Sequence, residues 1–152
     1  ELCRLDEIYS AVKAPFEIRS GSEKVTRRFF KICNNGRENF TGLYKSLTEQ
    51  GICKGHQCIA YGLYMRDNGI ELSEGLAVYG YSICSAIVTN CVKLVPLSQL
   101  AGQKILGESF ELISSASEKA LFTDINDIGI SGAGFDLRAM QHERLYSRQY
   151  MS

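Results

Sequence analysis

The chain has 152 residues, 45% of them apolar and 22% charged, and its seventeen basic side chains balance seventeen acidic ones. This length suits one domain with a sizeable core, and a net charge near zero argues against broad attraction to nucleic acid or to an anionic membrane. No basic start followed by an apolar run and a cleavage site occurs, so we expect a cytoplasmic protein without a signal peptide, its six cysteines being free thiols.

The first half of the sequence predicts four helices joined by short Gly/Asn turns. Apolar residues recur at helical spacing, and turn residues separate the apolar groups. The predicted helices are one that ends before Pro15, one that starts at the capping box Ser20–Glu23 and ends at Asn34–Gly36, one from Phe40 to near Gly51, and one from about His56 to Arg66.

The central element is the stretch from Leu72 to Val95, where apolar residues recur at steps of three and four along one helix face. No charged residue occurs from Gly75 to Val92, and eighteen uncharged residues reach the length of a membrane span. Polar residues such as Asn90 dilute this run, and its flanks lack an anchoring pattern. The sequence therefore favours a buried core helix of a soluble protein, and Pro96 must bend or break it.

The segment after Pro96 predicts two more helices. Ser98 is placed to cap a helix that carries Leu100 to Ile113, and Ser115–Glu118 again has the form of a capping box. Within the central helix, Cys84 and Cys91 lie seven residues apart, or about 10 Å, which is too far for a disulfide. We interpret both as small core residues.

The C-terminal part begins with Asp127–Gly134, a segment with three glycines. No Lys-Ser or Lys-Thr follows, so the segment is more typical of a linker than of a phosphate-binding loop. The last helix is predicted to start at Asp136 as its N-cap, with Phe135 and Met140 at the spacing of a hydrophobic staple.

These patterns together predict an all-α fold, a single-domain bundle of about six to eight helices. Only two prolines occur, and alternating strand patterns are scarce. In this prediction residues 1–134 form the bundle core, and residues 135–152 form a C-terminal helix and a partner-binding tail of the same domain.

One short segment raises the possibility of a metal site. Cys53, His56 and Cys58 place three donors for zinc or nickel within six residues. A structural zinc site usually needs four donors, and the other histidine, His142, is far away in the sequence. We therefore favour structural roles for these residues, while a metal-binding or metalloenzyme domain stays open as the alternative.

The tail carries Arg144, Tyr146, Arg148 and Tyr150 at alternate positions. In an extended chain all four side chains point to one side. Arginine and tyrosine are the residues that most often dominate protein interfaces. A partner-binding tail and a tail docked on its own domain both fit this pattern, as does a generic helical interaction module with an unrelated partner.

Three segments carry a resemblance to a known family. They are Asp136–Ser152, Asn90–Leu106 with its Val-Pro-Leu-Ser-Gln and Gly-Gln sequences, and Ala14–Ser22 with its Pro-Phe-Glu-Ile-Arg sequence. His56 and the pair Tyr61-Gly62 also match. In this order the segments resemble the urease accessory protein UreF family, and the resemblance predicts that the chain corresponds to the C-terminal two-thirds of a member.

The resemblance implies a non-enzymatic, homodimeric scaffold that binds no cofactor itself. Family members bridge the accessory protein UreD (UreH in some bacteria) and the GTPase UreG, so that nickel reaches apo-urease within the complex. No nucleic-acid or membrane partner is implied. By resemblance, the residues for UreD/UreH are Arg144, Tyr146, Arg148, Tyr150 and Met151, and the residue for UreG is Lys93. Tyr81 lies about three helix turns before Lys93, so we expect it to share the UreG surface. The residues expected to shape and support this region are Pro96, Gln99, Gly102 and Gln103.

Overall fold

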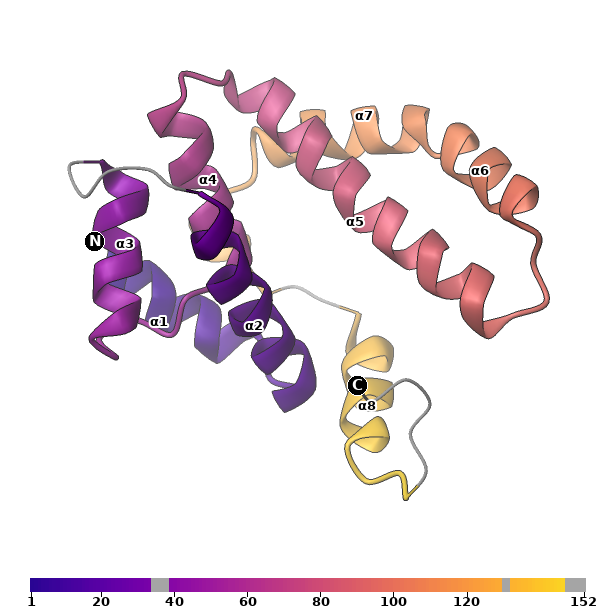
Figure 1. The fold of residues 1–152 in the computed structure, drawn as a ribbon, viewed down its shortest axis with the longest axis horizontal. Coiled ribbons are helices and arrows are strands. Elements are labelled where there is room, and N and C mark those ends of the chain that lie inside the picture. The colour runs from indigo at the N-terminus through magenta and orange to yellow at the C-terminus, as the bar shows by residue number, and fades with distance from the viewer. Residues whose placement is uncertain (34–38, 130–131, 147–152) are drawn as a thin grey trace. The chain divides into compact units, whose positions relative to one another are not determined.

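The computed structural model describes residues 1–33, 39–129 and 132–146, and these residues form eight α-helices and one 3-10 turn, with no strand (Figure 1). The predicted all-α class is thereby confirmed. In chain order the elements are α1 (Leu2–Val12), α2 (Phe16–Ile32), α3 (Phe40–Glu49), α4 (Gln57–Asp67), α5 (Leu72–Leu94), α6 (Gln99–Glu108), α7 (Phe110–Ala120), η1 (Ile125–Asp127) and α8 (Ala133–His142).

The helices group into two compact units. One unit comprises Glu1–Asp67 together with the chain from Asn126 onward, so it holds α1 to α4 and α8. The other unit is Asn68–Ile125 and holds α5, α6 and α7. The predicted boundary between residues 134 and 135 falls inside α8 and stays a prediction.

An aromatic core holds α2, α3 and α4 together in the first unit. Phe30 and Tyr44 are buried and meet edge to face, with ring centroids 6.0 Å apart. Phe29, one residue earlier on α2, packs against Tyr61 and Tyr64 of α4, with ring centroids 4.5 and 5.3 Å apart. Because aromatic residues bury the largest apolar areas, these contacts supply much of the packing in this unit.

Helix α2 begins four residues earlier than the sequence predicted. Its N-cap is Pro15, so Ser20 and Glu23 lie inside the helix and do not form a capping box. Proline has no side-chain acceptor, and the carboxylate of Glu143 supplies one instead, accepting hydrogen bonds from the amides of Phe16 at 2.8 Å and Glu17 at 3.4 Å. The cap comes from a residue 127 positions away from Phe16, which no local pattern can reveal.

The second unit is built on α5, which packs against both α6 and α7 (Figure 1). As predicted, α5 ends at Leu94 before Pro96, and the hydroxyl of Ser98 caps α6 by accepting a hydrogen bond from the amide of Ala101 at 3.1 Å. Glycine permits close packing here, since a Cβ on Gly102 would lie 2.7 Å from Cγ2 of Val92.

The prediction that α5 is a buried core helix is wrong. Gly75 is its one buried residue, and Cys91, expected in the core, is exposed. By length and composition alone α5 could also cross a membrane. Only 6% of its most apolar 18-residue window is buried, whereas the core helix of a soluble protein would be mostly buried. Helices α6 and α7 cover part of its surface, whereas Val78 and Ile87 remain more than half exposed.

Two further helix starts differ from the prediction. Helix α7 starts after Ser109, so Ser115–Glu118 lies inside it. Helix α8 starts after Gly132, which places Asp136 in its first turn and rules out the proposed staple between Phe135 and Met140. An acidic side chain in the first turn stabilises a helix through its dipole even when it is not the cap. Asp136 therefore indicated the helix correctly, but the helix begins earlier than predicted.

Candidate functional site: partner-binding surfaces

The end of α5 and the start of α6 enclose a cavity of about 390 Å³. Four of the residues predicted to bind UreG or to support its binding line it, namely Lys93, Gln99, Gly102 and Gln103. Val88, Thr89 and Val92 of α5 form the rest of the wall, and a Cβ on Gly102 would lie only 3.2 Å from Cγ1 of Val88 and 2.7 Å from Cγ2 of Val92. The structure thus brings one cation, two amides and a glycine to the same place, a mixed polar surface suited to another protein's polar groups.

Pro96 positions this surface from the connection between the two helices. The amide of Leu97 donates a hydrogen bond to the carbonyl of Val95 at 2.6 Å, which makes a tight turn around Pro96. Since proline cannot continue the helix, the chain reverses within four residues and α6 runs back along α5.

Tyr81 does not join this group. It lies twelve residues before Lys93 on the same helix, which is about 18 Å along the axis. Its ring stacks on Phe110 of α7, with centroids 5.9 Å apart and planes inclined by 11°. Tyr81 also borders a shallow uncharged hollow with Val78, Ala86 and Asn90. The two residues predicted for one partner therefore occupy separate parts of α5.

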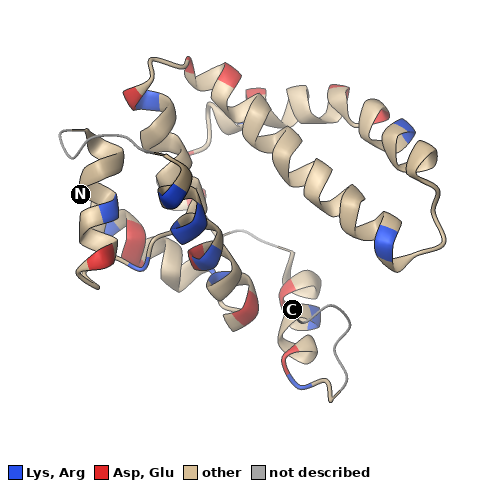
Figure 2. Ribbon diagram, viewed as in Figure 1, with Lys and Arg blue, Asp and Glu red and all other residues tan. Residues whose placement is uncertain are grey.

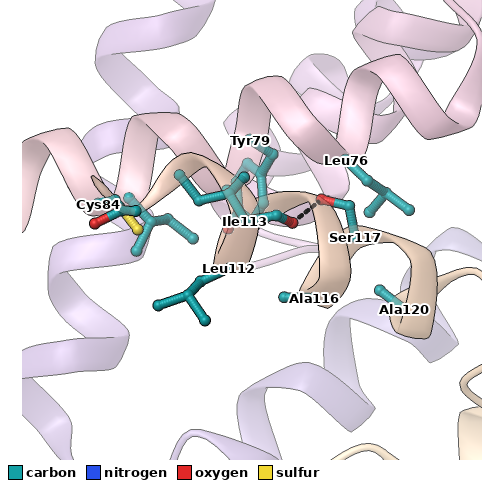
Figure 3. A pocket seen from close by; sticks show the side chains of 11 residues that line it. Leu76, Tyr79, Cys84, Leu112, Ile113, Ala116, Ser117 and Ala120 are labelled. Carbon is teal, nitrogen blue, oxygen red and sulfur yellow. Dashed lines mark hydrogen bonds between the residues drawn. The ribbon is translucent and has the colours of Figure 1, made fainter. Parts of the chain in front are cut away.

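The middle of α5 presents no charge between Glu74 and Lys93, in contrast to the many charged residues of α1 to α4 (Figure 2). On the side toward α7 this uncharged stretch borders an apolar cavity of about 420 Å³ (Figure 3). The hydroxyl of Ser117 donates to the carbonyl of Ile113 at 2.8 Å, so it is satisfied within the helix. The lining is otherwise dominated by Leu76, Ile83, Leu112, Ile113, Ala116 and Ala120.

The tail follows α8 and belongs to the first unit. No described residue of α8 is buried. Glu143 follows α8 directly, and its carboxylate accepts hydrogen bonds from the first amides of α2, which fixes the end of α8 there. His142 adds a second contact, with Nδ1 2.5 Å from the carboxylate of Glu17. Arg144 and Tyr146 follow directly, and the Tyr146 side chain is fully exposed. Arg148, Tyr150 and Met151 lie outside the described residues.

The three metal-site candidates do not converge. Cys53 faces Cys3 of α1, with 3.7 Å between the sulfurs, whereas Nε2 of His56 lies 2.7 Å from the hydroxyl of Ser10. Burial raises the pKa of the Cys58 thiol, which Tyr9 and Lys13 oppose. No group of three His, Cys, Asp or Glu side chains able to hold a metal ion occurs within residues 1–33, 39–129 and 132–146. The metal-binding alternative therefore gains no support.

His56 instead belongs to a buried polar network that the sequence did not reveal. The Tyr44 hydroxyl donates to the carboxylate of Asp6 at 2.6 Å and accepts from the amide of His56 at 2.8 Å. Asp6 also accepts from the amides of Lys54 at 2.7 Å and Gly55 at 3.0 Å. Burial raises the pKa of Tyr44 far above its usual range, and the bond to Asp6 adds to this. The network fixes the turn between α3 and α4 against α1.

The network predicts a loss of stability in mild acid. Burial lowers the pKa of His56 below its ordinary value of 6.5, outweighing the opposing effect of Asp6. The unfolded chain therefore takes up a proton more readily, and the free energy of unfolding should fall as the pH drops from about 6.5 through the folded-state pKa, by at most about 1.4 kcal/mol per pH unit.

Urea denaturation between pH 7.5 and 5.5 measures this slope. A His56→Gln variant should lose most of this slope, since it removes the buried imidazole. Equal slopes in the wild type and His56→Gln would show that another group is responsible.

Comparison with known proteins places the chain in a family. The family model described as UreF matches residues 1–109. The chain is 35% identical to the urease accessory protein UreF of Actinobacillus pleuropneumoniae serotype 3 over 153 residues, covering 99% of this chain and 67% of that protein. It is 31% identical to UreF of Paenarthrobacter aurescens, covering 97% of this chain and 67% of the relative, and 35% identical to UreF of Haemophilus influenzae, covering 99% and 65%. The chain therefore belongs to the urease accessory protein UreF family.

Proposed function

We propose that this protein is a cytoplasmic urease maturation scaffold that bridges UreD/UreH and the GTPase UreG, so that nickel is inserted into apo-urease within their complex. Family membership supports the role in urease maturation. The observation that supports the bridging role is that the two candidate surfaces belong to different units: the Lys93 cavity at the α5–α6 turn to one, and the tail that follows α8 to the other.

The scaffold acts by geometry and performs no chemistry of its own. Asp6, Tyr44 and His56 are buried and linked by hydrogen bonds, and this network holds α1 against the turn between α3 and α4. In this proposal nickel is cargo of the assembled complex, and its transfer follows from assembly and from the nucleotide state of UreG. The protein acts as a homodimer, as the resemblance implies.

Lys93 is the residue we assign to UreG. Its cation follows a stretch of eighteen uncharged residues on α5, and an acidic group of a partner could pair with it beside the amides of Gln99 and Gln103. We assign Lys93 as a hot spot of this interface, and replacing a hot-spot residue costs about 2 kcal/mol or more of binding free energy. Lys93→Ala should therefore weaken UreG recruitment by about thirtyfold.

The experiment is capture of UreG from purified components by a complex of this protein with UreD/UreH, measured by biolayer interferometry with GTP present. Lys104→Ala is the matched control, since Lys104 is an exposed lysine of the same unit that pairs with Glu108 on α6 at 3.9 Å. Circular dichroism checks that both variants keep their helices. Failure of the wild-type complex to capture UreG would reject the proposed function, and equal capture by both variants would remove Lys93 from the interface.

A further inference from the structure

Two thiols from distant parts of the sequence meet in the first unit. Cys3 lies in the first turn of α1, and Cys53 lies in the turn between α3 and α4, fifty residues later. Their sulfur atoms are 3.7 Å apart, and both are free thiols. A disulfide bond is about 2.05 Å long, so the sulfurs need to approach by less than about 2 Å.

The backbone around Cys53 is held in place independently of the thiols. The amides of Ile52 and Cys53 both donate to the carbonyl of Leu47, at 2.9 and 3.2 Å, which ties the turn to the end of α3. The next two amides, of Lys54 and Gly55, donate to the carboxylate of Asp6. Asp6 lies three residues after Cys3, on the same face of α1. The bonds that fix the turn against Asp6 thus also set Cys53 opposite Cys3.

From this geometry we propose that Cys3 and Cys53 are an oxidation site, at which a peroxide closes a disulfide between α1 and the turn that leads into α4. This inference is independent of the proposed scaffold function. Nothing in it requires a partner protein.

The two thiols have different access, which sets the order of the steps. Cys53 is 3% exposed, whereas Cys3 is partly exposed and meets a solvent-borne oxidant first. Burial and the contact with Cys3 raise the pKa of Cys53 to about 12, which keeps it protonated until its partner has been oxidised. Cys3 is therefore the thiol that reacts with peroxide, and Cys53 is the one that resolves the product.

The chemistry balances with hydrogen peroxide as the oxidant. The Cys3 sulfur attacks one peroxide oxygen, the O–O bond breaks, and the departing hydroxide leaves as water with the thiol proton. This gives a sulfenic acid at Cys3. The Cys53 sulfur then attacks the Cys3 sulfur and forms the S–S bond, while the S–O bond breaks and the hydroxide leaves as a second water with the Cys53 proton. The two sulfurs lose two electrons in total, and the peroxide gains them.

The chain contains its own control pair. Cys84 and Cys91 are seven residues apart on α5, which separates them by about 10 Å along the helix axis. Both lie at the protein surface or near it. Accessible thiols that are too far apart should be oxidised singly and should not form a disulfide with each other.

The test is titration of the purified full chain with hydrogen peroxide, followed by alkylation and non-reducing peptide mapping. We expect a linked pair of peptides containing Cys3 and Cys53, absent from Cys3→Ser and Cys53→Ser and retained when Cys84 and Cys91 are both replaced by serine. Since the bond closes a loop of about fifty residues, the cross-linked wild type should unfold at a temperature higher by about 5 °C or more than the reduced protein.

Two results would overturn the inference. One is a Cys3 sulfenic acid that dimedone traps in the wild type while no peptide containing Cys53 becomes linked. The other is a Cys84–Cys91 link at a yield equal to that of Cys3–Cys53, because the reaction would then not report the native geometry. Circular dichroism of each serine variant before oxidation establishes that it is folded.

Discussion

Replacing Asp6 by alanine is expected to lower the free energy of unfolding by about 3 to 5 kcal/mol. Asp6 is 2% exposed, and its carboxylate accepts hydrogen bonds from the Tyr44 hydroxyl and from the amides of Lys54 and Gly55. Alanine removes every acceptor at once and leaves three donors buried or partly buried without partners. The cost is large because such donors lose their hydrogen bonds to water as well as to protein.

Urea denaturation followed by circular dichroism measures the change. Glu7→Ala is the matched control, since Glu7 is the neighbouring acidic residue on α1 and is exposed. We expect it to change stability by no more than about 0.5 kcal/mol. Asp6→Asn, which keeps one carbonyl oxygen as an acceptor, should fall between the two. If Asp6→Ala were no less stable than Glu7→Ala, the network would not be holding the turn between α3 and α4.

Deleting residues 148–152 is expected to abolish binding to UreD/UreH. The deletion removes Arg148, Tyr150 and Met151, which we propose as partner contacts by their resemblance to the family's C-terminus. Arginine and tyrosine contribute about 2 kcal/mol or more each when buried in a partner, so the loss of two or more such contacts should weaken binding by at least about a thousandfold. The last helix in the described part of the chain ends at His142, before the deleted residues, so the deletion should leave the described helices unchanged.

Isothermal titration with purified UreD/UreH measures the affinity. Tyr146→Ala tests a described residue of the same tail. Because the Tyr146 side chain is fully exposed, its removal should not unfold the protein, and weaker binding would then reflect a lost partner contact. Arg138→Ala is the control, since this exposed arginine of α8 bonds to Gln141 on its own helix at 3.2 Å. Unchanged affinity after the deletion would place the UreD/UreH interface elsewhere on the molecule.

Local patterns predicted most of the helices correctly. Ser98 and Pro96 act within a few residues of their own positions, so the end of α5 and the start of α6 could be expected from the sequence. Where the prediction failed, a distant or competing contact decided the outcome. At Pro15 the cap of α2 comes from Glu143, so the capping-box sequence at Ser20 is inside the helix.

The candidate site divides in the same way. Lys93, Gln99 and Gly102 lie in one segment, Asn90–Leu106, that resembles the family. The turn at Pro96 places all three around one cavity. Tyr81 was linked to Lys93 by helix spacing, but stacking on Phe110 assigns it to another part of α5. Asp6 carried no signal at all, since one acidic residue in an amphipathic helix is ordinarily solvated.

By itself the sequence determined the all-α class, the family and most helix limits, because helical periodicity, caps and breakers act over a few residues. Only the tertiary structure decided what each helix face meets. It left α5 largely exposed although its composition is that of a core helix, and it buried Asp6 although its neighbours are those of a surface helix. Burial depends on which distant segments pack together, and the hydrogen bonds from Tyr44, Lys54 and Gly55 to Asp6 join residues that are brought together only by that packing.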